Sequence, residues 1–92
     1  MEKVRLGIVG LGNIGRYHAD YLLQGKVARC ELVAVCSSRP QSHRYPQVQV
    51  FSEAEALFRS GIVDAVIIAT PHYQHAPLGI AALEAGLHVL VE

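Results

Sequence analysis

The chain begins with an apolar run that leads into a glycine-rich turn, Gly7-Ile8-Val9-Gly10-Leu11-Gly12-Asn13-Ile14-Gly15. This is the pattern G-x-G-x-x-G, and a helical pattern begins inside it. In such a turn the first glycine permits a tight bend, the second lets the backbone approach a pyrophosphate, and the third lets helix and strand pack closely. The helix start adds backbone N–H groups and the positive end of its dipole. The candidate phosphate-binding residues are therefore Gly10, Gly12, Asn13, Ile14 and Gly15.

Strand-like and helix-like segments alternate along the rest of the chain, which indicates a parallel, doubly wound sheet with right-handed crossovers. We expect a single Rossmann-like α/β domain over residues 1–92, with about five strands in the order 3-2-1-4-5 and no sixth strand before the sequence ends. The expected strands are residues 3–9, 30–36, 48–51, 65–69 and 88–91, and the expected helices are residues 13–24, a helix between Ser52 and Gly61, and residues 75–85.

Local signals refine two of these helices. The helix after the glycine-rich turn should face the sheet with Ile14, His18, Tyr21 and Leu22, which share one-face spacing. Ser52 and Glu55 have the spacing of a capping box, so Ser52 is expected to cap the short helix, and Gly61 to end it.

The residues that follow the expected strands fall on one edge of the sheet. Gly10 follows the first strand, Ser37 the second, Thr70 the fourth and Glu92 the fifth. In the strand order 3-2-1-4-5 the first and fourth strands lie side by side where the winding reverses, and ligands of such folds bind outside the carboxyl ends there. This agreement makes the glycine motif much more specific than it is alone.

Composition excludes several classes of function. The 92 residues carry eight basic and eight acidic side chains. Their net charge of zero gives no excess of positive charge that would attract nucleic acid or an anionic membrane. No apolar run reaches the length of a membrane span, and no signal peptide is apparent. Cys30 and Cys36 on one strand would lie about 20 Å apart, beyond disulfide reach. We expect free thiols and a cytoplasmic protein.

The residues after the second strand bear on the choice between NAD and NADP. NAD sites usually place an acidic side chain there, but no carboxylate occurs between Glu31 and Glu53. The sequence instead has Ser37, Ser38 and Arg39. Two hydroxyls and a guanidinium suit a 2′-phosphate, so NADP is favoured over NAD. The alternative is that Arg39 is a solvated loop residue and that the site accepts both cofactors.

Essentially the whole chain, including the G-x-G-x-x-G motif, resembles a known family. The stretches carrying the resemblance are Asp64–Pro71, Thr70–His75 and Ala82–Glu92, with His18 beyond the glycine motif. The chain is similar to the N-terminal domain of the glucose-fructose oxidoreductase, inositol dehydrogenase and MocA family (Gfo/Idh/MocA). The resemblance implies a domain that binds NAD(P) in an oxidoreductase transferring hydride to or from a sugar, polyol or related carbonyl. It also implies nicotinamide-side contacts from the segment containing Thr70, Pro71, His72 and His75.

The resemblance further implies that catalysis needs more chain than these 92 residues. In the family a glutamate matching Glu92 precedes a lysine that assists proton transfer, and a C-terminal domain supplies the substrate pocket. The sequence ends at Glu92, so we expect cofactor binding without turnover and no catalytic residue within it. We also expect the strand His88–Val91 to present an apolar edge that favours self-association.

Two alternatives to this function stay open. The same fold serves non-catalytic domains that sense NAD(P) or regulate other proteins, since fold does not fix function. A reductase of similar architecture could also act on a different carbonyl or on an imine. A metal site is not expected, because His72 and His75 have suitable spacing but no third ligand is evident.

Overall fold

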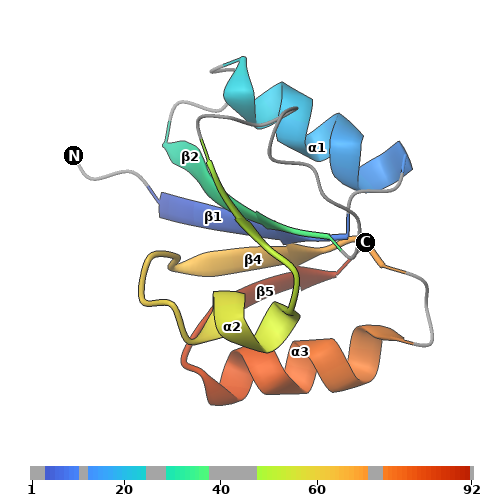
Figure 1. The fold of residues 1–92 in the computed structure, drawn as a ribbon, viewed down its shortest axis with the longest axis vertical. Coiled ribbons are helices and arrows are strands. Elements are labelled where there is room, and N and C mark those ends of the chain that lie inside the picture. Colours follow the sequence, from blue (N-terminus) through green and yellow to red (C-terminus); the bar gives the residue numbers. More distant parts are fainter. Residues whose placement is uncertain (1–3, 11–12, 25–28, 38–47, 71–73, 92) are drawn as a thin grey trace.

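The computed structural model describes residues 4–10, 13–24, 29–37, 48–70 and 74–91, and within this set the side chains of residues 13–16 are not described. Five strands and three helices alternate along these residues (Figure 1). The strands are β1 (Val4–Val9), β2 (Cys30–Cys36), β3 (Gln49–Phe51), β4 (Ala65–Ile68) and β5 (His88–Val91), and the helices are α1 (Asn13–Leu23), α2 (Ala54–Phe58) and α3 (His75–Glu84).

The strands form one sheet in the order β3-β2-β1-β4-β5, and every neighbouring pair is parallel. The expected doubly wound α/β fold is therefore confirmed, including the position of the reversal between β1 and β4. Parallel neighbours need crossovers, and helices in those crossovers cover both faces of the sheet. In Figure 1, α1 lies on one face, and α2 and α3 lie on the other.

Each face of the sheet has its own core. Leu6, Ile8 and Val35 pack with Ala19 and Leu22 of α1. On the opposite face a second cluster joins the sheet to α2 and α3, and its members are Val9, Ala34, Cys36, Leu57, Phe58, Val63, Val66, Ile68 and Ala82. Alternate residues of β1 and β4 thus point to opposite layers, as side chains on a strand must.

The pairing of β1 with β2 contains an irregularity that alternation does not predict. Leu6 pairs with Leu32 and Gly7 pairs with Ala34, so Val33 is the extra residue of a bulge. Ala34 belongs to the core on the α2 and α3 side, and Val33 packs against that same core. The bulge therefore places two consecutive residues of β2 on one face.

Two local expectations were wrong. The N-cap of α2 is Glu53, which is extended and makes no side-chain capping hydrogen bond, so Ser52 does not cap this helix. The helix spans residues 54–58, so its first residue lies one position later than the capping box requires. On α1 Leu22 is buried as expected, but Tyr21 is 39% exposed and the fully buried position is Ala19.

The end of α3 shows why glycine follows it. Gly86 has a φ of 83°, and its N–H donates to the carbonyl of Leu83 at 2.9 Å. The N–H of Leu87 donates to the carbonyl of Ala82 at 3.1 Å. These two bonds make a Schellman motif, which satisfies carbonyls that have no partner within the helix. The predicted stop at Gly86 is therefore confirmed.

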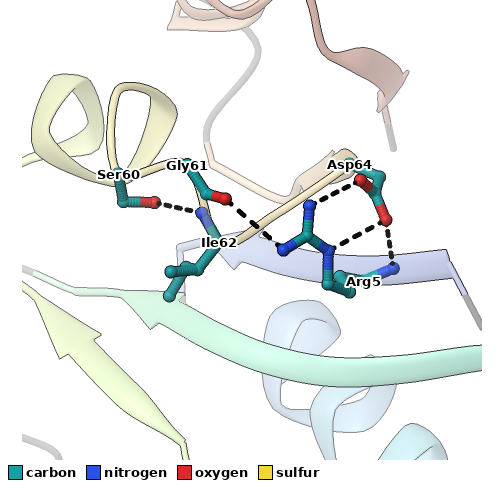
Figure 2. A network of polar contacts seen from close by, with 5 residues as sticks. All are labelled: Arg5, Ser60, Gly61, Ile62 and Asp64. Carbon is teal, nitrogen blue, oxygen red and sulfur yellow. Dashed lines mark hydrogen bonds and ion pairs between the residues drawn. The ribbon is translucent and has the colours of Figure 1, made fainter.

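A polar network fixes the amino-terminal ends of β1 and β4 (Figure 2). The Arg5 guanidinium donates to both carboxylate oxygens of Asp64, at 2.9 and 3.2 Å, and the Arg5 backbone N–H donates to the same carboxylate at 2.9 Å. The guanidinium also reaches the carbonyl of Gly61 at 3.4 Å, while the Ser60 hydroxyl accepts from the N–H of Ile62 at 3.3 Å. These hydrogen bonds lower the pKa of Asp64 to about 2.

Cys30 and Cys36 are free thiols, as expected. Burial raises the pKa of the Cys36 thiol to about 11, and the charge of Glu53 adds to this effect. Among the described residues no helix is long and apolar enough to cross a membrane.

Candidate functional site

The turn after β1 lies at the carboxyl end of the sheet, where β1, β2 and β4 meet. The N–H of Gly10 donates to the carbonyl of Cys36 at 2.9 Å, which extends the β1–β2 ladder by one residue. On the other side, the N–H of Ala69 donates to the carbonyl of Val9 at 2.9 Å. Gly10 is thus held between the ends of β2 and β4, at the point where the winding reverses.

Gly10 could not be replaced by a larger residue without movement of its neighbours. Its φ is 94°, a conformation that side-chain-bearing residues rarely adopt. A Cβ atom built on Gly10 would lie 2.9 Å from Cγ2 of Thr70 and 3.0 Å from the carbonyl oxygen of Ala69. The structure thus gives Gly10 a backbone conformation that favours glycine and a close approach to the segment after β4.

Thr70 packs its methyl group toward this turn and carries a buried hydroxyl for which the described residues provide no hydrogen-bond partner. Its Oγ1 is buried and has no hydrogen-bond partner among the described residues. A buried hydroxyl without a partner costs about 1–3 kcal/mol, so such groups in proteins usually have a reason. Cγ2 and Oγ1 are bonded to the same Cβ of Thr70, so the side chain that packs its methyl group toward Gly10 also carries the buried hydroxyl.

His75 is the first residue of α3 and turns back toward the end of β4. Its Nε2 lies 2.6 Å from the carbonyl oxygen of Thr70, and the contact is partly buried. The sequence placed His75 among the nicotinamide-side contacts, whereas the structure places its ring on the backbone of a neighbouring site residue. The acceptor is a backbone carbonyl, which every residue type has, so the sequence carries no signal for this contact.

Ser37 continues the sheet on the other side of Gly10. Its N–H donates to the carbonyl of Phe51 at 3.0 Å, so it stands at the carboxyl end of β2 between β1 and β3. Ser37 is half-buried there. The structure thus brings Ser37, Gly10 and Thr70 to one rim, in the lateral order of strands β2, β1 and β4.

Two helices begin at this same rim (Figure 1). The first turn of α1 follows the glycine-rich turn and contains no acidic residue. Its leading N–H groups lack partners within the helix, and the positive end of its dipole favours an anion. Nothing in that turn repels a phosphate, and the backbone of Asn13, Ile14 and Gly15 supplies the helix start that the sequence predicted.

Several predicted site residues lie outside the described residues. They are Gly12, Ser38, Arg39, Pro71, His72 and Glu92. Their assignment to the cofactor site stays a prediction from the sequence.

A hollow of about 840 Å³ lies at the opposite rim of the described sheet. It is bordered by the ends of α2 and α3 and by charged groups that include Arg59, Asp64 and Glu84. Of the predicted site residues that the structure describes, none lines it. The chemistry of the glycine turn selects the carboxyl rim and not this hollow.

The carboxyl rim fits a dinucleotide in three respects. Gly10 has no side chain at a point where a Cβ would strike Thr70. Thr70 carries a buried hydroxyl that has no partner among the described residues, and the first turn of α1 contains no acidic residue. Backbone N–H groups and the dipole suit a pyrophosphate, and the hydroxyl suits a polar group of a sugar or an amide. Gly10, Ser37, Thr70 and the start of α1 are the described parts of this site.

Comparison with known proteins agrees with the geometry. The sequence profile of an oxidoreductase family with an NAD-binding Rossmann fold, GFO_IDH_MocA, matches residues 4–92. The chain is 37% identical over 94 residues to the uncharacterized oxidoreductase YdgJ of Escherichia coli, covering 99% of this chain and 27% of the relative. It is 31% identical over 96 residues to an inositol 2-dehydrogenase of Corynebacterium glutamicum, covering 99% of this chain and 28% of the relative.

A solved structure shows the same fold at similar identity. The crystal structure of scyllo-inositol dehydrogenase from Lactobacillus casei, with bound cofactor NAD(H) and scyllo-inositol, superposes with a TM-score of 0.90 and 30% identity. The match covers 98% of this chain and 28% of that one. The chain spans about a quarter of the length of the relatives it matches, at 27% and 28%. The family model describes an NAD-binding Rossmann fold, and the chain belongs to the Gfo/Idh/MocA oxidoreductase family.

Proposed function

We propose that these residues bind NADP as the cofactor domain of an oxidoreductase that transfers hydride to or from a sugar, polyol or related carbonyl. The observation that carries the proposal is the pairing of the Gly10 turn with Thr70 where the winding reverses. The names of the relatives support the class of substrate, since they include inositol dehydrogenases.

Replacing Thr70 with valine tests this proposal through two effects of opposite sign. Valine keeps the branched shape and removes the hydroxyl that lacks a partner among the described residues, so the free energy of unfolding should stay constant or rise. If the hydroxyl serves the cofactor, the same change weakens binding about fivefold or more, the value of one net hydrogen bond. Urea denaturation and a cofactor titration measure the two effects, and unchanged affinity would contradict a role for Thr70.

The preference for NADP rests on the end of β2. Ser37 stands on the rim, and the sequence has no carboxylate between Glu31 and Glu53 to receive the ribose hydroxyls of NAD. A titration with both cofactors, repeated with Arg39→Ala, tests this part. We expect NADP to bind more tightly than NAD and the difference to shrink in the variant. An equal preference before and after the change would remove Arg39 from the site.

Catalysis is proposed for a longer protein and not for these 92 residues alone. The chain should bind cofactor without oxidising a polyol, because the residues that would handle the substrate are expected after Glu92. Turnover by the 92-residue chain with inositol or another polyol would overturn this part. A longer protein that binds cofactor and turns over no carbonyl, imine or polyol would favour the alternative of a sensing domain.

We also infer that the 92-residue chain self-associates through β5. This strand is the outermost of the described sheet on its side, and Leu90 and Val91 are 56% and 45% exposed. An apolar outer strand invites pairing with another chain. Leu90→Lys should lower the mass seen in sedimentation at high concentration, and a monomeric parent chain at that concentration would contradict the inference.

A further inference from the structure

We propose that His75 is a positioning residue, whose ring donates from Nε2 to the carbonyl of Thr70 and thereby sets the place of Thr70 beside the glycine turn. The proposal rests on the proposed function, because its effect on binding requires the cofactor to lie at this rim. It differs from the role expected from the sequence, in which His75 itself contacts the nicotinamide side.

The short contact fixes the position of one proton. A carbonyl oxygen can only accept a hydrogen bond, so the Nε2 atom that lies 2.6 Å from it must carry hydrogen. In the neutral ring this selects the tautomer protonated at Nε2. That tautomer is observable in solution and does not depend on any ligand.

The bond joins two elements that meet at the site. Thr70 lies two residues after the end of β4, and His75 is the first residue of α3. On its β4 side the segment is already held, since the N–H of Ala69 donates to the carbonyl of Val9 at 2.9 Å. The His75 ring adds a second attachment on the α3 side, and Thr70 is the residue between them.

This second attachment matters because the place of Thr70 is narrowly defined. Its Cγ2 lies 2.9 Å from the point where Gly10 would carry a Cβ, and its Oγ1 is buried without a partner among the described residues. A small movement of the Thr70 backbone would carry the hydroxyl away from the glycine turn. Misplacement of a binding group by about 1 Å is enough to weaken its interactions strongly.

Three substitutions separate the donor from the rest of the ring. His75→Gln keeps an N–H donor at about the distance of Nε2 from the backbone, His75→Asn places its donor too close to the backbone, and His75→Leu has none. The matched control is His88→Leu, which makes the same chemical change at an exposed position at the opposite rim.

We expect NADP to bind the Leu and Asn variants about 5- to 10-fold more weakly than the parent chain, and the Gln variant within about twofold of the parent. His88→Leu should leave the affinity unchanged. Rescue by glutamine but not by asparagine is the result that a general loss of stability cannot produce. Equal affinity in the parent, Leu and Gln chains would overturn the proposal.

Nuclear magnetic resonance without cofactor separates this proposal from the proposed function. The 15N shifts of the parent ring should show the tautomer protonated at Nε2, and the Thr70 amide signal should move in the Leu and Asn variants and return in the Gln variant. A ring protonated only at Nδ1, or a Thr70 signal unmoved by His75→Leu, would overturn the positioning role. If these signals behave as expected but the parent chain binds neither NADP nor NAD, the proposed function fails and the His75–Thr70 contact stands.

Discussion

Gly10→Ala is the substitution that tests the geometry of the rim most fully. The new methyl group would meet two obstacles at once. The backbone has a φ of 94°, and the methyl carbon would lie 2.9 Å from Cγ2 of Thr70, 3.0 Å from the oxygen of Ala69 and 3.1 Å from its carbonyl carbon. Two of these atoms belong to the backbone beside β4, which a side-chain rotation cannot move away. The ends of β1 and β4 would therefore have to separate.

The expected loss of stability has two parts. A left-handed backbone costs a residue with a Cβ about 1–2 kcal/mol relative to glycine. Forcing an extra carbon into a closely packed position costs about 1–3 kcal/mol more. The sum of about 2–5 kcal/mol would lower the melting temperature of a domain of this size by about 8 °C or more. Cofactor binding should weaken as well, because the backbone that faces the pyrophosphate moves.

Gly61→Ala is the matched control for the conformational part. Gly61 has a φ of 78°, but a Cβ there would meet no atom of the described residues within 4 Å. Gly61→Ala should therefore lower the free energy of unfolding by about 1–2 kcal/mol, the cost of the backbone conformation alone. Urea denaturation of the parent chain and both variants gives the two differences. Equal losses for Gly10→Ala and Gly61→Ala would refute the close approach of the turn to β4.

Three further predictions concern the core, the opposite rim and the thiols. Gly7→Val should lower the free energy of unfolding by about 1–3 kcal/mol, because even its Cβ would lie 3.0 Å from Leu57 and 3.2 Å from Val63. Urea denaturation measures this change, and a loss below about 0.5 kcal/mol would contradict the close packing around Gly7. Folding lowers the pKa of Asp64 from 3.8 to about 2, so its stabilising effect is complete above pH 3.8 and disappears as the pH falls through 2. Urea denaturation should show that the free energy of unfolding of the parent chain exceeds that of Asp64→Asn above pH 3.8, and that this excess shrinks as the pH falls toward 2. An excess that does not change with pH would count against the Arg5 hydrogen bonds. Cys36 is buried and its pKa is raised to about 11, so it should react with a thiol reagent at pH 8 more slowly than the half-buried Cys30. Peptide mapping of the labelled chain measures the two rates, and faster labelling of Cys36 would contradict its burial.

The fold could be predicted because several independent signals agree. The glycine motif, the continuous apolar run in β4 and the spacing of strands and helices all indicate one topology, and the structure has the predicted strand order. The position of the site followed from that order, since the carboxyl ends of parallel strands share one edge. Gly10, Ser37 and Thr70 reached this edge through topology alone.

What the sequence missed depends on contacts between distant residues. Val33 forms a bulge because β2 must match the register of β1, and a single strand carries no record of its partner. Ser52 had the capping spacing, but α2 begins at Ala54 and its cap position is occupied by Glu53. The Arg5–Asp64 pair joins residues that lie 59 positions apart, and the contact of His75 with the Thr70 carbonyl depends on a side-chain direction. Patterns along the chain do not specify such distances.

The central claim is that a nicotinamide dinucleotide binds at the carboxyl rim, and a titration followed by amide resonances tests it directly. Addition of NADP should shift the signals of Gly10, Ser37 and Thr70 along one saturable curve. The signals of Asp64 and His88, which border the hollow of about 840 Å³ at the opposite rim, should stay in place. Shifts confined to that hollow, or the absence of saturable binding with both NADP and NAD, would contradict the account.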